Sequence, residues 1–453
     1  MNGRNANKKE KTTKITLLFL LLCNTLVAQI PTAADPLSKD NLIIAFQQRF
    51  DAMDSLISGV FHTSNPSILQ QWDYSAPEGV ESIKQSIQAQ TDLFKSQNGL
   101  DLSGHLYARP LGKMGYDSDD PSAAYTAKAQ LELRWNIFQS SLMNRANNIR
   151  ELQLQGELEQ LEFEKQAMSR LIFDYKLNIE REFNSSLLFL LNYHSDNIHL
   201  ITQTEAFLLK QGSIASDDIL KNMEKQVDID RQINAIKSHD IFDTPSCLPI
   251  ILTVNIDSAT LVNSILNSYL DIKALNLEME IADCRTNSIK WFEQASLYPF
   301  VRYSWYARTT SGSMNNLDAG IGFSIPLSTE TTNRRRAANA KKAVLEYRKT
   351  QAIEQIMFEV NTIIKDIKLC NSYIQSEQEH LNELRQYLAD RNDSYVNGSG
   401  DYNRLHRLEE YNALLSSWEK LLENGYKRDL KLADLQSYVT NVSISQYIEY
   451  IIP

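Results

Sequence analysis

The sequence predicts a mainly α-helical protein with a small transmembrane β portion, built from long antiparallel helical hairpins and four β-strands per chain. The first observation is internal repetition: an alternating segment that ends at Ile137 recurs at Ile325, 188 residues later, and each copy leads into a long polar helix. The second is the glycine that ends each helix, Gly212 in the first copy and Gly398 in the second. Repetition on this scale usually reflects duplication, so it indicates the architecture before any motif is considered.

Residues 1–28 have the pattern of a secretory signal peptide. Four lysines precede a mostly apolar stretch of 13 residues, and the small Ala28 fits a signal-peptidase site, which makes Gln29 the expected first mature residue. The apolar stretch is too short to cross a bilayer as a helix, which takes roughly 20 residues. Cys23 follows Leu22, where a lipoprotein signal has a small residue, so lipidation of Cys23 stays an open alternative. We expect an exported chain.

The expected mature chain is acidic. Removing the leader takes five basic residues and one acidic residue from totals of 46 and 56, which leaves a net charge of −14. This charge argues against nucleic acid as a partner, because nucleic-acid binding requires a basic face. Three cysteines remain (Cys247, Cys284 and Cys370), without metal-ligand spacing, and idle thiols are favoured over a disulfide. No later segment approaches 18 consecutive apolar residues, which leaves a soluble periplasmic protein and a transmembrane β-barrel as alternatives.

The first structural repeat is expected to span residues 29–240. It opens with a helix whose apolar residues recur at spacings of three and four, followed by a proline-containing loop and a second helix. Two strands and a long helical hairpin complete the repeat. The expected elements are helices at 37–60 and 78–97, strands at about 100–110 and 123–138, and a hairpin at 144–238 whose return helix starts at Asp217.

The second structural repeat, residues 258–453, has the same order of elements. Residues 241–257 separate the repeats; they contain two prolines and a short apolar run, and we expect an irregular equatorial linker. The expected elements are a helix at 258–293, strands at about 297–308 and 316–327, and a hairpin at 333–440 whose return helix starts at Arg404.

The two long helices are unusual for a globular protein. At 1.5 Å of rise per residue, each would extend roughly 100 Å. Helices of this length need partners that bury their apolar stripes. The second carries a coiled-coil-like seam at mostly three- and four-residue spacing, formed by Val344, Tyr347, Ile353, Ile356, Val360, Ile363 and Ile367. The polar turns around Gly212 and Gly398 therefore predict antiparallel hairpins.

The strands alternate apolar and polar side chains. In the segment 123–138 the apolar residues, Trp135 among them, face one way and residues of both charges face the other; the segment 297–308, with Tyr303 and Trp305, alternates in the same manner. About ten such residues cross the hydrocarbon of a bilayer when tilted, and aromatic residues form girdles at its surfaces. A strand of a soluble sandwich alternates equally well. Four matched strands, attached in pairs to very long helices, favour the membrane barrel.

Four strands per chain cannot close a membrane barrel, which has eight strands or more. An open edge cannot face lipid, because each unpaired backbone group costs several kcal/mol there. Two copies would form an eight-stranded barrel filled by its own side chains, whereas a wider barrel of three copies can hold a channel. Since long polar helices below a barrel make sense around a conduit, the sequence predicts a trimeric 12-stranded barrel with an α-helical tunnel.

No catalytic constellation is evident, so the chain is predicted not to be an enzyme and to need no cofactor. The seven histidines include no metal-binding pair, and the sequence has no glycine-rich phosphate loop, nucleophile elbow or cysteine–histidine pairing. The basic cluster Arg334–Arg336 has two interpretations, a lining of the tunnel or a solvated helix face, and the solvated face is favoured.

Several short patterns occur in a consistent order along the chain. They are Asn65-Pro66 between the first two helices, Tyr298-Pro299 at the start of a strand, Ile325-Pro326-Leu327 before the arginine-rich helix, and Tyr395-Val-Asn-Gly398 at the end of a hairpin. Their order, spacing and duplication resemble the TolC-type outer-membrane efflux proteins over essentially all of the mature chain. The resemblance implies a homotrimer in the outer membrane of a Gram-negative bacterium, with a twelve-stranded barrel and a periplasmic helical tunnel.

The resemblance also implies a gate at the periplasmic ends of the hairpins. The best-known family members place acidic residues shortly after the hairpin glycine. The expected tip residues are Gly212 with Asp217 and Asp218, which fit this pattern, and Tyr395 and Gly398 with Arg404 and Arg407, which depart from it. An arginine opposite Asp218 would form a closing ion pair. The alternative is a solvated charged tip, where an ion pair contributes under about 1 kcal/mol.

The predicted function is a passive exit duct of a tripartite efflux or type I secretion system, which conducts small molecules or polypeptide from the periplasm to the exterior. The implied partners are a periplasmic adaptor protein, an inner-membrane pump that supplies the energy, and outer-membrane lipid. The alternative is a periplasmic coiled-coil adaptor or scaffold without a pore. The residues do not distinguish drugs, metals or secreted protein as cargo, nor do they identify the pump.

Overall fold

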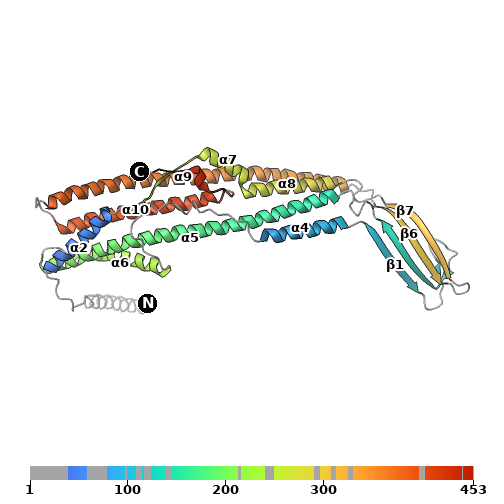
Figure 1. The fold of residues 1–453 in the computed structure, drawn as a ribbon, viewed down its shortest axis with the longest axis horizontal. Coiled ribbons are helices and arrows are strands. Elements are labelled where there is room, and N and C mark those ends of the chain that lie inside the picture. The colour runs from blue at the N-terminus through green and yellow to red at the C-terminus, as the bar shows by residue number, and fades with distance from the viewer. Residues whose placement is uncertain are drawn as a thin grey trace, which may run out of the picture. The chain divides into compact units, whose positions relative to one another are not determined.

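The computed structural model shows long helices attached to an antiparallel sheet (Figure 1). It describes residues 39–58, 79–96, 99–108, 115–116, 124–135, 137, 145–212, 216–239, 249–289, 296–307, 313–324, 330–396, 403–440 and 442–451. The expected signal peptide, the Asn65-Pro66 and Ile325–Leu327 patterns, and Gly398 lie outside the described residues.

The order of elements alternates helices and strands in two rounds. The helices are α2 (Lys39–Ser58), α4 (Gly79–Ser96), α5 (Arg145–Lys210), α6 (Ser216–His239), α7 (Ser258–Ser268), α8 (Leu270–Ser288), α9 (Glu330–Val396) and α10 (Arg404–Gln436), with a 3-10 turn η1 (Ile444–Tyr447). The strands are β1 (Leu100–Ala108), β2 (Gly115–Tyr116), β3 (Ala124–Tyr125), β4 (Ala127–Trp135), β5 (Thr253–Ile256), β6 (Ser296–Ala307), β7 (Ser313–Ser324) and β8 (Ile448–Ile451). Helices α5 and α9 are the long ones, with 66 and 67 residues.

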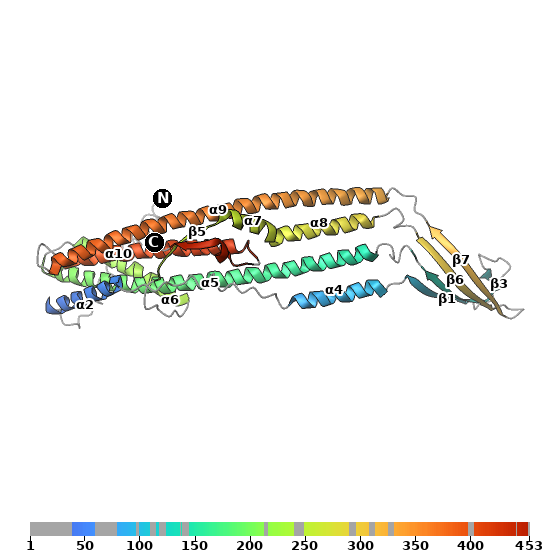
Figure 2. The same ribbon diagram turned by 45° about the horizontal axis from the view of Figure 1, so that its top comes forward.

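The main sheet has four antiparallel strands in the order β1-β4-β6-β7. Strands β1 and β4 come from the first predicted repeat and β6 and β7 from the second, and the pairing of β4 with β6 joins them. The labelled strands β1, β6 and β7 lie together in both ribbon views (Figures 1 and 2). Strand β7 begins three residues before the predicted 316–327, because Ser313 to Asn315 continue its pairing with β6.

The helix predicted at 258–293 is in fact two helices. Tyr269 separates α7 from α8 with an extended backbone, φ −63° and ψ 129°. Its ring stacks on the ring of Tyr438, with centroids 5.3 Å apart. This contact comes from a distant part of the chain, so the helical periodicity of 258–293 could not indicate the break. Figure 2 shows that α8 lies beside α9, to which it is tied by Lys342 and Asp283 with a nitrogen–oxygen distance of 2.8 Å.

The linker expected to be irregular, 241–257, contains strand β5, which pairs antiparallel with β8 near the C-terminus. The Asn371 side chain of α9 also holds this strand: it donates to the Val254 carbonyl at 2.6 Å and accepts from the Val254 amide at 3.3 Å. The return helix expected to reach 440 ends at Gln436, because the chain folds around that buried side chain, which accepts a hydrogen bond from the Ile444 amide at 2.7 Å.

The chain forms two compact units, and each draws on both predicted repeats. The first combines the segment up to Ser64 with Glu180–Ile251 and Ser372–Tyr426; the second combines Asn65–Ile179, Leu252–Asn371 and Lys427–Pro453. None of the described helices is long and apolar enough to cross a membrane. Cys284 and Cys370 are free thiols, and burial raises the pKa of both.

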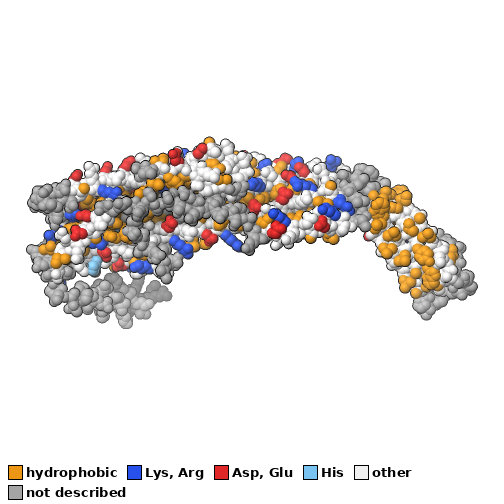
Figure 3. All heavy atoms as spheres, in the orientation of Figure 1, with side chains coloured by type: hydrophobic (Ala, Val, Ile, Leu, Met, Phe, Trp, Pro, Cys, Tyr) orange, Lys and Arg blue, Asp and Glu red, His pale blue; other side chains and the backbone are white. Residues whose placement is uncertain are grey.

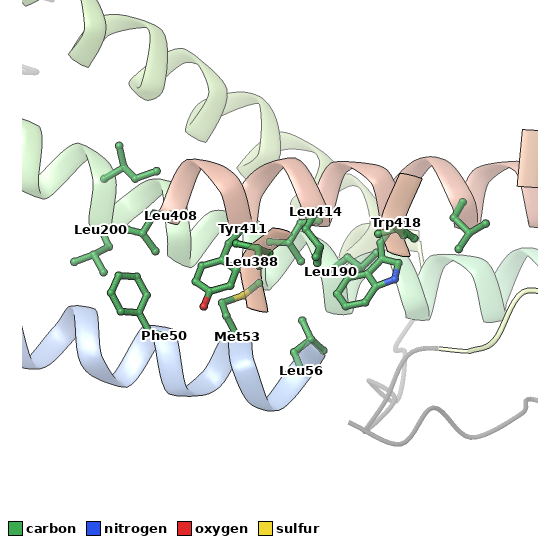
Figure 4. Packing of buried hydrophobic residues seen from close by; sticks show 14 of the residues in the cluster. Phe50, Met53, Leu56, Leu190, Leu200, Leu388, Leu408, Tyr411, Leu414 and Trp418 are labelled. Atoms are coloured by element: carbon green, nitrogen blue, oxygen red, sulfur yellow. The ribbon is translucent and has the colours of Figure 1, made fainter. Parts of the chain in front are cut away.

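Each unit has its own hydrophobic core. The core of the first unit joins the apolar stripe of α2 to α5, α9 and α10, with Met53 and Tyr411 fully buried (Figure 4). In the same unit, α6 folds back on α5 through Leu188, Leu191, Ile198, Ile229 and Ile233. The second unit packs α7, β5, η1 and the end of α10 against α9; its core residues in α9 are Ile356, Val360, Ile364 and Ile367. These α9 residues include three of the seam positions that the periodicity indicated.

Candidate functional site

The four-stranded sheet has one apolar and one polar face. Leu102, Leu133, Val301 and Ala319 are Cα partners in one row across all four strands, so their side chains point to the same side. The exposed large residues of this apolar face are Leu100, Leu102, Leu106, Leu131, Leu133, Trp135, Val301, Tyr303, Trp305, Leu317, Ile321 and Phe323. Figure 3 shows hydrophobic side chains gathered over this sheet. An exposed apolar surface of this extent marks contact with a membrane or another protein.

The dimensions of the strands suit a membrane wall. Strands β1 and β4 have nine residues each, and β6 and β7 have twelve. A tilted membrane strand needs about 9–11 residues. Leu102 and Leu317 are each 72% exposed, and Phe323 is 74% exposed. In water this exposure would be unfavourable, whereas in lipid the same side chains are fully solvated.

The polar face carries balanced charges. Its central row pairs Ser103 with Glu132, Glu132 with Arg302, and Arg302 with Asp318. The side chain of Glu132 is only 5% exposed; one carboxylate oxygen lies 2.8 Å from Arg302 and the other 2.7 Å from Arg134. The alternation of the strands predicted that these residues lie on a polar face of mixed sign, but it did not indicate the Glu132 cluster. The cluster could be found only by knowing that Glu132 lies opposite Arg302, and this depends on the register of β4 on β6.

Two aromatic rings on this face cover glycines of the neighbouring strand. Tyr298 and Phe300 of β6 are the Cα partners of Gly322 and Gly320 in β7. A Cβ atom at Gly322 would lie 2.4 Å from the Tyr298 ring, and one at Gly320 would lie 2.9 Å from the Phe300 ring. The Arg134 guanidinium lies over the Tyr298 ring, 4.5 Å from its centroid. Glycine in β7 therefore has a packing role, because it leaves room for the rings that connect the strands.

The sheet is open at both ends. Strands β1 and β7 stand at the two ends of the strand order, so each pairs with a single neighbour in the described sheet. An unpaired edge exposes backbone amide and carbonyl groups that seek partners. If the apolar face lies in lipid, these groups must pair with strands from another chain.

The end of the first hairpin is a glycine turn. Gly212 has a positive φ of 73°, and its amide donates to the Leu209 carbonyl at 2.9 Å, which terminates α5. A left-handed glycine is the usual residue just beyond a helix C-terminus. Helix α6 then starts at Ser216, so Asp217 and Asp218 lie in its first turn. Their side chains lie outside the described residues.

The end of the second hairpin is described on both sides of its turn. Tyr395 is in the last turn of α9, with its side chain outside the described residues. Helix α10 begins at Arg404, and Asn403 caps it by accepting a hydrogen bond from the Leu405 amide at 3.0 Å. Arg407 lies in the same first turn but is buried, with 6% of its side chain exposed.

Arg407 contacts α2 instead of lying on a solvated tip. Its guanidinium lies 3.2 Å from the carboxylate of Asp54, and its Nε donates to the Tyr411 hydroxyl at 2.9 Å. The Tyr411 hydroxyl donates to Asp54 at 2.5 Å. Burial, and next the hydrogen bond to Asp54, raise the pKa of Tyr411. The expectation of a second charged tip position at Arg407 missed this arrangement, because nothing in the sequence indicates which side chain α2 brings to α10.

A polar pocket of about 300 Å³ lies next to this helix start. Its charged side chains come from both arms of the hairpin: Arg391 of α9 pairs with Glu410 of α10, and His406 lies 3.3 Å from Glu410. In the described part of the chain, no group of three histidine, cysteine or acidic residues could hold a metal ion. The pocket therefore presents charges and hydrogen-bonding groups, and the Arg391–Glu410 ion pair among them joins α9 to α10.

The comparisons with known proteins resolve the fold. No protein-family model matches the chain. No curated protein matches it either. Among solved structures, the chain is similar to the Campylobacter jejuni CmeC outer membrane channel, with a TM-score of 0.55, 11% identity, and coverage of 88% of this chain and 89% of that one. The similarity to CusC has a TM-score of 0.53 at 14% identity and covers 86% of this chain and 92% of CusC. The similarity to the open state of the Neisseria gonorrhoeae MtrE outer membrane channel has a TM-score of 0.51 at 10% identity. It covers 86% of this chain and 88% of that channel.

The chain thus has the fold of the TolC-type outer-membrane channels, and the resemblance predicted from the sequence is confirmed at the level of the fold. The likeness covers 86–88% of the chain rather than one local motif. At 10–14% identity it concerns the fold.

Proposed function

We propose that this protein is a passive exit duct in the outer membrane of a Gram-negative bacterium, and that it conducts small molecules or polypeptide from the periplasm to the exterior. The observation that carries the proposal is the exposed apolar face of the four-stranded sheet, opposite a charge-balanced polar face. The apolar face would contact lipid and the polar face would line the channel.

The duct would be a homotrimer with a twelve-stranded barrel. The support is the pair of open edges, β1 and β7, which in lipid must pair with other strands. Three copies of four strands give the smallest closed wall that is wide enough for a channel. The hairpins formed by α5 with α6 and by α9 with α10 would form the tunnel below the wall.

The partners of the duct would be a periplasmic adaptor protein and an inner-membrane pump, the latter being the source of energy. The gate would lie at the hairpin ends, at Gly212, Asp217 and Asp218 of one hairpin and Tyr395, Gly398 and Arg404 of the other. Arg407 is buried and paired with Asp54 of α2. This contact supports a role in keeping the hairpin end in place rather than a position on the surface of the gate.

Membrane fractionation together with single-channel recording tests this proposal. The protein should remain in outer membranes after a carbonate wash, migrate as a trimer after cross-linking, and form channels in planar lipid bilayers. A protein that the wash releases and that forms no channels would instead be the periplasmic adaptor or scaffold.

A further inference from the structure

Helix α2, the first helix in the described part of the chain, completes the core of the first unit. Its buried apolar stripe consists of Leu42, Phe46, Phe50, Met53 and Leu56. The stripe packs against Leu190 and Leu200 of α5 and against Leu408, Tyr411 and Leu414 of α10. Figure 4 shows Phe50 and Met53 pointing from α2 toward Tyr411 and Leu200. One helix thus contacts an arm of each hairpin.

An ion pair between the half-exposed Asp54 and the buried Arg407 joins α2 to the first turn of α10. Asp54 accepts from the Tyr411 hydroxyl at 2.5 Å and lies 3.2 Å from the Arg407 guanidinium. This guanidinium lies over the ring of Phe50, 4.6 Å from its centroid, and so contacts α2 a second time. Because the Arg407 guanidinium is buried, loss of its contact with the Asp54 carboxylate is unfavourable, so the pair favours one position of α2 along α10.

A second polar network joins α2 to both hairpins. Arg49 donates to the Asn197 side chain of α5 at 2.5 Å and pairs with Asp196 of α5 at 3.1 Å. Asn197 is completely buried and donates in turn to Asn412 of α10 at 3.0 Å. Arg49, Asn197 and Asn412 therefore form one hydrogen-bonded chain across α2, α5 and α10.

We infer that α2 is a latch that holds the end of the second hairpin to the first and keeps the proposed duct closed. This inference rests on the proposed function, because a latch needs a gate to control. Parting of the hairpin ends would move the first turn of α10 away from α5, and α2 would have to leave one of them. Every such movement breaks either the Asp54–Arg407 pair or the Arg49–Asn197 network.

The test uses the full-length protein in detergent and in planar bilayers. In Asp54→Asn, the amides of α2 should exchange with solvent at least about tenfold faster than in the wild type, because local opening no longer breaks the ion pair. Mean single-channel conductance should rise at least about twofold, because the hairpin ends part more often. The exchanged pair Asp54→Arg with Arg407→Asp should return both values toward those of the wild type.

The matched control is Lys165→Gln, which removes an exposed ion pair with Asp271 in the second unit and should change neither value. If Asp54→Asn fails to fold, Tyr411→Phe removes only the hydroxyl bound to Asp54 and should show both effects in the same direction. Faster exchange of α2 without a change in conductance would overturn the latch, because α2 would then only pack. Absence of channels in the wild type would overturn the duct itself, and the latch with it.

Discussion

At the scale of single residues, Glu132 lies at the centre of a charge cluster on the polar sheet face. Its carboxylate lies between two arginines, Arg134 and Arg302, and its side chain is 5% exposed. A buried carboxylate between two cations neutralises part of their field, and its removal leaves both cations without that partner. Because the cluster lies on the face that would line the duct, this single residue would affect both the stability of the wall and the ions that pass it.

We expect Glu132→Gln to make the proposed channel more anion-selective, because the substitution removes one negative charge per chain and leaves both arginines. The reversal potential across a KCl gradient should shift toward that of chloride. Glu132→Asp keeps the charge and is the control, with a reversal potential close to the wild type. An unchanged potential in Glu132→Gln would show that this face does not line the ion path.

The acidic and basic residues of the hairpin ends give a second prediction at this scale. Asp218→Ala and Arg404→Ala should each raise single-channel conductance, because each removes a charge that we expect to hold the tips together. The effect should shrink at high salt, which screens exposed charges. Equal conductance in both variants and the wild type would remove these residues from the gate.

At the scale of elements, the register of β7 on β6 depends on glycines. We expect Gly322→Ala to lower the thermal midpoint of the sheet, because its Cβ would lie 2.4 Å from the Tyr298 ring. Gly104→Ala in β1 is the matched control: its Cβ would meet Leu131 at 3.4 Å, an ordinary contact. Circular dichroism of the β signal during heating distinguishes the two. Equal midpoints would mean that the Tyr298 ring moves aside without cost.

The small sheet of β5 and β8 gives a prediction of pH dependence. Burial, and next the charge of Asp429, raise the pKa of Tyr450 in β8 to about 12. A raised folded-state pKa means that the folded chain holds its proton longer than the unfolded chain, whose tyrosine pKa is about 10. The contribution of Tyr450 to stability is therefore complete below pH about 10 and is lost as pH rises toward 12.

Urea unfolding of the full chain at a series of alkaline pH values measures this effect. The free energy of unfolding should fall as pH rises above about 10. Tyr450→Phe has no ionisable hydroxyl and should make this fall shallower. An equally steep fall in the variant would assign the dependence to other partly buried tyrosines, such as Tyr438, whose pKa is also raised by burial.

At the scale of the whole molecule, the local patterns predicted much of the fold. The alternation from Ala127 to Trp135 predicted β4, and the spacing of Ile356, Val360 and Ile367 predicted a buried seam of α9. These features depend on residues within a few turns or along one strand, so a single stretch of sequence contains the signal. The pairing of β5 with β8, and the break at Tyr269, depend on partners far along the chain and had no such signal.

The candidate site also has features that local patterns predicted and features that depend on distant partners. The apolar face of the sheet followed from the period of two in each strand. The Glu132 cluster required the register between β4 and β6, and the burial of Arg407 required the position of α2 on α10. The distance of Arg407 from Gly398 predicted a position near the expected gate. Nothing local in the sequence indicates that its partner is Asp54, which lies 353 residues away.

The sequence by itself determined the periodicities of this protein: which faces of its strands and helices are apolar, where the hairpins turn, and that the elements occur in two rounds. Periodicity is a local property, because it follows from the geometry of one strand or one helix. Only the tertiary structure decided the distant partners: β5 with β8, Glu132 with Arg302, and Asp54 with Arg407. The choice of partner depends on packing between segments that lie far apart in the sequence. The same apolar stripe on α2 is compatible with many neighbours until its polar groups meet theirs.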